Sequence, residues 1–409
     1  MALKQIPIAS LKIGMHITKL DIPWMDSPFV RHHLTIKSEK DLKKLLKAGV
    51  KKVTIDTMKG EDVAKEKNTK KATTKKSVDK KTVEENKEPK TVESVPIEQE
   101  LNVAKALMDN ITTLSDNMNQ ALKNDQTIEL EHISPLIEGT LQSLGRNNQA
   151  MTTLVNMQRK ASNLANHAFA TFSLALNLSI KMELDAEAQH ALGLAALLHD
   201  TGWLKLPLHL LGKSSRYNDN EVKLTEQHIA IGYKLLKKNC DLPDLSLRII
   251  EEHHEYCNGS GYPKRLSADK IHTLSKLFSV IDLYDELVHG LIDKPAITPH
   301  GALSYLYKMT TNNELDESIV TALVSVLSIY PVGSIVQLNN KEKGLVFDIN
   351  HDHPKQPKVR IYYDVCEMAH AEPRVLDLAN QKSDSPLEVI KVLDLHNAGV
   401  DPAHLMELS

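Results

Sequence analysis

Residues 253–263 read HHEYCNGSGYP, and two consecutive isoleucines stand shortly before this string. A related pattern occurs upstream, where His199 and Asp200 follow the apolar run 192–198. Ionisable side chains placed behind such apolar runs cost several kcal/mol unless they are paired or bound to a metal. We therefore expect both strings to contribute to a buried polar site.

Helical periodicity dominates the surrounding sequence from about residue 141 to residue 330. The predicted helices cover 150–181, 185–199, 220–238, 243–255, 267–290, 298–310 and 315–330. Aromatic residues make up only 4% of the chain, which suits an Ala/Leu-rich helical protein better than a β-sandwich. The sequence thus predicts a mainly α fold, with a helical connector at 98–145 and an all-α domain at 146–330.

The flanking regions differ in character from this helical core. Residues 1–57 alternate β-like runs with one helical run between Ser38, a good N-cap, and Gly49, so we expect a small α+β domain. Residues 58–97 are rich in lysine and polar residues and predict a flexible, charged linker. Residues 331–409 contain the runs GSIVQL, GLVFDI and KVRIYYD, which predict a β-rich C-terminal extension that ends in a terminal helix.

Composition, charge and hydropathy exclude several classes of protein. The chain has 409 residues with a net charge of −3, which gives no case for binding a nucleic-acid polymer. Its three cysteines are far apart and odd in number, so a disulfide framework is not expected and a reducing compartment is favoured. We see no secretory signal and no run of about 18 apolar residues, so we expect no membrane span and a cytoplasmic location.

A short seam with heptad-like spacing precedes the helical core. It consists of Leu101, Ala104, Met108, Ile111, Met118 and Leu122, and Ser115 interrupts it. Such a seam fits two readings, a helix packed on its own domain or the interface of a homodimer. The sequence favours neither over the other.

Five histidines and two aspartates lie near apolar stretches of the predicted helices. They are His167, His199, Asp200, His228, His253, His254 and Asp282. Taken singly, each has an ordinary explanation, such as a hydrogen-bonded core histidine or an acid on a helix surface. Together they match a carboxylate-bridged dinuclear metal site, because imidazoles suit Fe, Mn or Zn and a carboxylate can bridge two cations.

The segment from about residue 150 to residue 330 resembles the HD-GYP family of metal-dependent phosphohydrolases. The string HHEYCNGSGYP matches the family pattern H-H-E-x-x-[DN]-G-x-G-Y-P, and the HD pair stands upstream at the expected place. An HD pair alone is a weak signal, whereas the pair followed by this string is a strong one. Residues 1–57 also resemble the small N-terminal domain that often precedes HD-GYP domains.

The resemblance implies a cyclic di-GMP phosphodiesterase that produces linear pGpG, GMP or both by in-line attack of a metal-bridged hydroxide. The implied ligands of two divalent ions, Fe or Mn, are His167, His199, Asp200, His228, His253, His254 and Asp282. His199 and Asp200 would also be catalytic, with Asp200 bridging the metals. The implied substrate-binding residues are Gly259, Gly261, Tyr262, Pro263 and Lys294, and the GYP turn would also suit contacts with other signalling proteins.

The chain lacks two positively charged side chains of the family pattern. Trp203 and Leu291 stand where the family has a lysine and an arginine that contact substrate phosphate. Tryptophan carries one N–H donor and no charge, so it cannot replace that contact. Candidate substitutes nearby are Lys205, Lys213, Lys264 and Arg265. Asn163 stands where some members place a glutamate that binds a third metal, so two ions are expected.

Three functions remain open from the sequence. The first is an active cyclic di-GMP phosphodiesterase. The second is a degenerate HD-GYP domain that binds cyclic di-GMP or a partner protein without hydrolysis, for which Trp203 and Leu291 argue. The third is a metal phosphohydrolase with another substrate, such as a different cyclic dinucleotide, because a fold or a metal shell does not specify the substrate.

Overall fold

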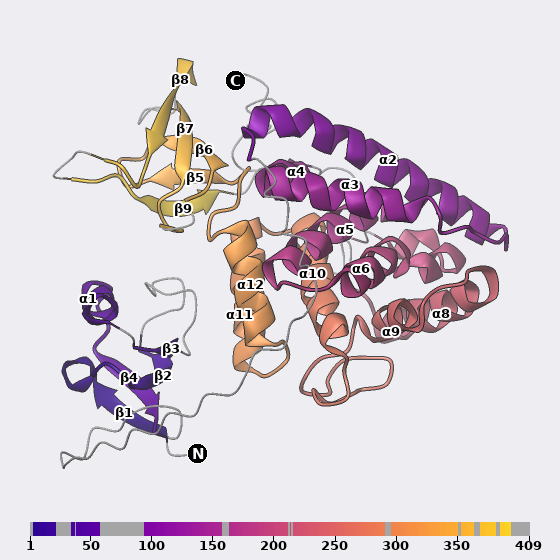
Figure 1. Cartoon of the computed structure of the whole chain (residues 1–409), viewed down its shortest axis with the longest axis horizontal. Coiled ribbons are helices and arrows are strands. Elements are labelled where there is room, and N and C mark those ends of the chain that lie inside the picture. Colours follow the sequence, from indigo (N-terminus) through magenta and orange to yellow (C-terminus); the bar gives the residue numbers. More distant parts are fainter. Residues whose placement is uncertain are drawn as a thin grey trace, which may run out of the picture. The chain divides into compact units, whose positions relative to one another are not determined.

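The computed structural model describes residues 3–21, 34–36, 38–57, 94–157, 163–211, 213, 216–290, 296–350, 353–363, 369–381 and 385–393 (Figure 1). The chain divides into two units, Met1–Thr91 and Val92–Ser409, which are treated separately below. The predicted linker lies largely in 58–93, outside the described residues.

The first unit contains a four-stranded sheet and one helix. Its elements are β1 (Leu3–Pro7), β2 (His16–Leu20), β3 (Leu34–Thr35), α1 (Glu39–Lys47) and β4 (Lys52–Asp56), with the strand order β1-β4-β2-β3. Ser38 caps α1 as predicted, because its side chain accepts a hydrogen bond from the Asp41 N–H while Asp41 bonds back to the Ser38 N–H. Met15, Ile17 and Leu45 lie in a buried apolar core between helix and sheet. The predicted α+β character is confirmed.

The second unit begins with a helical domain. Its helices are α2 (Ile97–Lys123), α3 (Ile133–Arg146), α4 (Asn148–Met157), α5 (Leu164–Lys181), α6 (Ala186–Leu198), α7 (Asp219–Thr225), α8 (Gln227–Asn239), α9 (Asp244–Glu252), α10 (Thr273–His289), α11 (Pro299–Thr311) and α12 (Glu317–Leu327). A short 3₁₀ helix, η3 (Thr201–Lys205), connects to the end of α6. The mainly α fold class is confirmed.

The heptad-like seam lies on α2, which packs against α3, α4 and α5 of the same domain. Ile111, Met118 and Leu122 are buried there. Glu100, near the start of α2, accepts two hydrogen bonds from the guanidinium of Arg146 at 2.7 and 2.8 Å, which ties α2 to the end of α3. The structure therefore shows packing of the seam within the domain, and the homodimer interface stays a prediction.

Helix α5 forms the centre of the domain. Nearly all of its side chains are buried, and it contacts α2, α6, α10 and α12 (Figure 1). A helix that is apolar all round is expected to be enclosed by others. This position brings the first turns of α5 next to the C-terminal end of α6 and to the face of α10, where the candidate site lies.

The chain ends in a five-stranded antiparallel sheet with the order β8-β7-β6-β5-β9. Its strands are β5 (Ile335–Leu338), β6 (Lys343–Asp348), β7 (Lys358–Tyr363), β8 (Ala369–Asp377) and β9 (Val389–Leu393). Strands β5, β6 and β7 coincide with the three predicted β-branched runs. Asn156 on α4 donates a hydrogen bond to the Val332 carbonyl at 2.8 Å, which links the sheet to the helices.

Several predicted boundaries differ from the structure. The predicted terminal helix is wrong at 389–393, because the sequence VIKVL pairs with β5 as strand β9, and 394–409 lie outside the described residues. The predicted helix 150–181 is two helices, α4 and α5. Helix α10 begins at Thr273 rather than at 267, because the residues before it form turns.

Two further predictions concern cysteines and membranes. Cys240 and Cys257 are free thiols, and Cys366 lies outside the described residues. Among the helices that the structure describes, none is long and apolar enough to cross a membrane.

Candidate metal centre

The seven predicted ligands come together where five helices meet. His167 lies on the first turn of α5, His199 caps α6, and His228 lies on the first turn of α8. His253 caps α9 and His254 follows it, while Asp200 begins η3 and Asp282 lies on α10. Helix termini are suited to this, because they leave the chain free to turn and aim a side chain at a common point.

Gly202 allows this convergence. A Cβ atom at Gly202 would overlap the carbonyl group of His228, so only glycine lets η3 pack directly on α8. Gly232, one turn after His228, lies against the same backbone of η3. The two glycines bring Asp200 and His228 close enough for an Oδ1–Nε2 distance of 3.6 Å.

The histidine rings are oriented through their Nδ1 atoms. In three of them Nδ1 donates a hydrogen bond to the carbonyl three residues earlier: His199 to Ala196 (3.1 Å), His228 to Thr225 (2.6 Å) and His253 to Ile250 (2.7 Å). In His167, Nδ1 donates to the Asp285 carboxylate at 2.7 Å. A neutral imidazole that donates from Nδ1 carries a lone pair on Nε2. Each of these rings therefore turns an electron-pair donor toward the centre.

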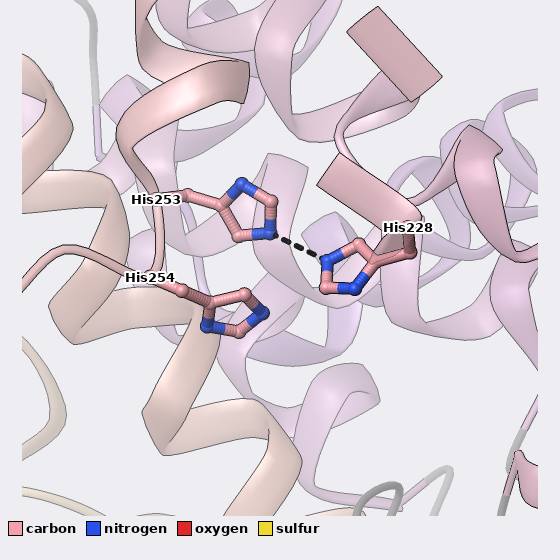
Figure 2. A group of neighbouring side chains, drawn as sticks. All are labelled: His228, His253 and His254. Atoms are coloured by element: carbon pink, nitrogen blue, oxygen red, sulfur yellow. Dashed lines mark hydrogen bonds between the residues drawn. The ribbon is translucent and has the colours of Figure 1, made fainter. Parts of the chain in front are cut away.

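These Nε2 atoms face one another closely. The Nε2 atoms of His167 and His199 are 3.0 Å apart. Those of His228 and His253, joined by the dashed line in Figure 2, are 3.4 Å apart. Two lone pairs at such distances repel each other unless a proton or a metal ion lies between them. Two ligand atoms, each about 2.1 Å from one ion, are themselves about 3–4 Å apart. The donor set and its spacing thus fit metal ions.

The centre has two ends, which differ in how close they lie to the carboxylates of Asp282 and Asp200. Asp282 Oδ1 is 3.0 Å from His167 Nε2 and 3.3 Å from His199 Nε2; we call His167, His199 and Asp282 the carboxylate-rich end. His228, His253 and His254 form the imidazole end, which Figure 2 shows as three rings that face one another. Asp200 reaches both, because Oδ2 is 3.6 Å from His167 while Oδ1 faces His228.

The pKa values of the histidines shift in opposite directions at the two ends. Burial by itself would lower the pKa of His167, but hydrogen bonds with Asp282 and Asp285 hold it well above its ordinary value. At the imidazole end burial dominates and lowers the pKa of His254 strongly and that of His253 to about 3. The imidazole end is therefore a set of neutral rings ready to donate electron pairs.

Three family models match consecutive parts of the chain. They are a domain of unknown function (DUF3391) over residues 3–133, an HD domain over 131–319, and a KOW domain associated with HD domain over 335–396. All seven clustered residues and the string HHEYCNGSGYP fall within the second match. Residues 131–319 thus match an HD domain, in agreement with the resemblance to the HD-GYP family seen in the sequence.

Curated relatives agree with this. Cyclic di-GMP phosphodiesterase PA4108 of Pseudomonas aeruginosa is 28% identical over 378 residues, which cover 92% of this chain and 89% of the relative. The response regulator RpfG of Xanthomonas campestris, also named a cyclic di-GMP phosphodiesterase, is 32% identical over 31% of this chain and 34% of its own length. The 3′3′-cGAMP-specific phosphodiesterase 3 of Vibrio cholerae is 27% identical over 34% and 29%, respectively.

The GYP turn of this HD domain packs against the imidazole end. Gly259 has φ +79°, and a Cβ atom at Gly261 would overlap backbone atoms of His254 and Tyr256. The Tyr262 ring stacks on His254, with ring centroids 4.8 Å apart and planes 26° apart. These contacts position His254, whereas binding of substrate by Gly259, Gly261, Tyr262 or the exposed Pro263 remains a prediction.

Glu255, the third letter of the string, supports the same turn. Its buried carboxylate accepts hydrogen bonds from the Lys264 N–H at 2.6 Å and the Leu266 N–H at 2.8 Å. The family's HHE triplet in this chain thus combines two inward-facing histidines with one acid that holds the turn.

Trp203 is buried beside His228, a position that the sequence does not reveal. It is 2% exposed and packs with Leu206 and Leu210, and its indole stacks on the His228 ring with centroids 5.4 Å apart and planes 17° apart. Its Nε1–H has no partner among the described residues. Trp203 is therefore an apolar support of the imidazole end rather than a substrate contact.

The cations considered as substitutes are mostly engaged elsewhere. Lys205 donates to the Lys123 carbonyl, Lys213 pairs with Glu221 at 2.7 Å, and Lys264 pairs with Glu251 at 2.7 Å. Within the described part of the chain, Arg265 is exposed and has no such ion pair. Lys294 and Leu291 lie outside the described residues.

Sequence reasoning missed two acids of the centre, both on α10. Asp285 is fully buried and orients His167, and its Oδ1 lies 2.9 Å from His289 Nδ1. Glu286 Oε1 lies 3.9 Å from His254 Nε2. The signal was present, because Asp282, Asp285 and Glu286 are spaced i, i+3 and i+4 and so share one helix face.

Proposed function

We propose that this chain is a metal-dependent phosphodiesterase that hydrolyses cyclic di-GMP to linear pGpG, GMP or both. The observation that carries the proposal is the buried cluster of histidines whose Nε2 atoms face one another. The Asp282 carboxylate lies at one end of this cluster, and the Asp200 carboxylate reaches both ends. The names of the relatives support the substrate class.

The seven predicted ligands would hold two divalent ions, Fe or Mn, one at each end. When bound, such ions supply Lewis-acid chemistry: they lower the pKa of a water and neutralise charge on the attacked phosphate. The chain's own part is to position them. Backbone carbonyls hold His199, His228 and His253 in one tautomer, and Asp200 lies where it can bridge the two ends.

In the proposed reaction, a water oxygen bonds to phosphorus, the P–O3′ bond breaks, and the 3′ oxygen takes up a proton. One such step opens the ring to pGpG, and a second yields GMP. The burial of the cluster keeps bulk water away from the ligands, which strengthens the electrostatic interactions within it.

A second candidate function is non-hydrolytic binding of cyclic di-GMP or of a partner protein. Trp203 favours it, since a buried indole stands where the family carries a phosphate-binding lysine. Loss of two charge-assisted phosphate contacts at about 1.5–3 kcal/mol each would cost about 10²–10⁴ in affinity or rate. A different cyclic dinucleotide, such as the 3′3′-cGAMP of the Vibrio cholerae relative, is the remaining substrate hypothesis.

The test is to purify the full chain anaerobically, count Fe and Mn, and follow cyclic di-GMP conversion by chromatography. We expect bound metal, metal-dependent turnover, and loss of both in Asp200→Ala. The exposed Asp269→Ala serves as a matched control that keeps both. Bound metal and nucleotide without product would favour the receptor function, and a fully active Asp200→Ala protein would refute the proposal.

A further inference from the structure

We propose that Glu286 is a metal ligand of this chain and closes, with His254 and Asp282, a position for one more divalent ion. The inference rests on the proposed function, because it extends the same centre. It also revises the expectation of two ions drawn from the sequence, where Asn163 replaces the family's extra glutamate. Because a neutral imidazole has a single free electron pair, His254 would serve the additional ion, and His228, His253 and Asp200 would hold the ion of the imidazole end.

The geometry comes from α10 and the residue after α9. Glu286 lies one helical turn after Asp282, so both carboxylates leave the same face of α10. His254 lies between them: its Nδ1 is 3.7 Å from Asp282 Oδ2 and its Nε2 is 3.9 Å from Glu286 Oε1. One ligand atom from each residue falls within a common radius of 4.8 Å.

His254 provides an independent observation. It is 6% exposed, yet neither of its ring nitrogens makes a hydrogen bond to any residue that the structure describes. The other four histidines of the centre each bind a carbonyl or a carboxylate through Nδ1. A neutral imidazole carries one lone pair and one N–H. In His254 both ring nitrogens face a carboxylate, at 3.7 and 3.9 Å, so a cation bound to the nitrogen with the lone pair would have a carboxylate oxygen beside it.

Glu286 points inward. Its side chain is 13% exposed. Its Oε1 lies 3.9 Å from His254 Nε2, so the carboxylate faces the imidazole.

The position that would otherwise supply the extra carboxylate is used differently here. Asn163 caps α5, and its side-chain oxygen accepts a hydrogen bond from the Asn166 N–H at 2.8 Å. This bond keeps the Asn163 oxygen at the start of the helix. Glu286 instead brings a carboxylate to His254 from another helix, α10. An ion with three protein ligands also keeps an open position, as catalytic sites require for a substrate oxygen.

The test is a metal count on the full chain, purified anaerobically and equilibrated with Mn²⁺. Glu286→Gln keeps the size of the side chain but removes its charge. Glu251→Gln is the matched control, because Glu251 is a partly exposed glutamate that pairs with Lys264. We expect Glu286→Gln to hold one ion fewer per chain than wild type, and Glu251→Gln to hold as many as wild type.

The readout is elemental analysis together with a Mn²⁺ titration followed by electron paramagnetic resonance, with thermal melting to show that both variants fold. Equal counts and equal affinities in wild type and Glu286→Gln would overturn the inference and leave the proposed function standing. A wild-type chain that binds no ion would instead overturn the proposed function, and the inference with it.

Discussion

The two ends of the metal centre are built by different means. At the carboxylate-rich end, His167 lies between the buried acids Asp282 and Asp285. At the imidazole end, backbone carbonyls fix His228 and His253, and aromatic rings cover the group: Trp203 stacks on His228 and Tyr262 on His254. Carboxylates thus orient the His167 ring, whereas backbone hydrogen bonds and aromatic stacking orient the rings of the imidazole end.

The two ends would therefore offer metal ions different surroundings. The acids raise the pKa of His167, so that end attracts any cation, including a proton. Burial lowers the pKa of the rings at the imidazole end, which keeps them neutral and available as ligands. Changes at the two ends should therefore have different consequences.

The largest effect is expected from Asp282→Asn. Asp282 faces His167, His199 and His254, so its charge serves the carboxylate-rich end and the neighbouring His254. We expect loss of bound metal and a fall in turnover of at least about 10³-fold, since a metal ion contributes several kcal/mol of charge stabilisation. Elemental analysis and the cyclic di-GMP assay measure both, with Asp269→Asn as control. Unchanged metal content would mean that Asp282 is not a ligand.

Trp203→Ala tests the packing that supports the imidazole end. Removing a buried tryptophan side chain costs about 3–5 kcal/mol of unfolding free energy. Urea unfolding measures this loss, and Trp203→Phe, which keeps an aromatic ring against His228, should lose clearly less. If Trp203→Ala and Trp203→Phe were equally stable, the stack on His228 would contribute little.

Asp285→Asn tests the charge that supports the carboxylate-rich end. Residues that orient a ligand histidine are typically worth about 10–100-fold in metal affinity or activity. We expect metal affinity, measured by competition with a chelator, to fall in that range. An affinity equal to that of wild type would show that His167 is held in place without its carboxylate.

The smallest effect concerns pH in protein stripped of metal. The pKa of His253 in the folded state is about 3, below its ordinary value of 6.5, so the unfolded chain binds the extra proton and stability falls as pH decreases below 6.5. At pH 5.5 His253 should cost about 1 kcal/mol. His167, whose pKa is raised, acts in the opposite sense. Thermal melting between pH 8 and pH 5.5 should show a shallower decline in His253→Gln, and parallel declines would contradict this.

Local sequence signals predicted much of the fold. The Ser38 cap, the β-branched strands of the C-terminal sheet and the helices on either side of His199 follow from short-range patterns. Strand β9 was missed because VIKVL lies in a stretch with helix-like spacing, and its pairing partner β5 is about fifty residues away. Long-range pairing of this kind overrides local preference.

Residue types and their spacing predicted the candidate ligands, because both can be read from short stretches of the sequence. The way in which those residues are held and paired appears only in the folded structure. The fold placed Trp203 behind His228, engaged Lys205, Lys213 and Lys264 with other partners, and brought Asp285 and Glu286 to the rings of His167 and His254. The physical reason is that burial, ring orientation and charge pairing depend on helices that are distant in sequence and meet only in the folded protein.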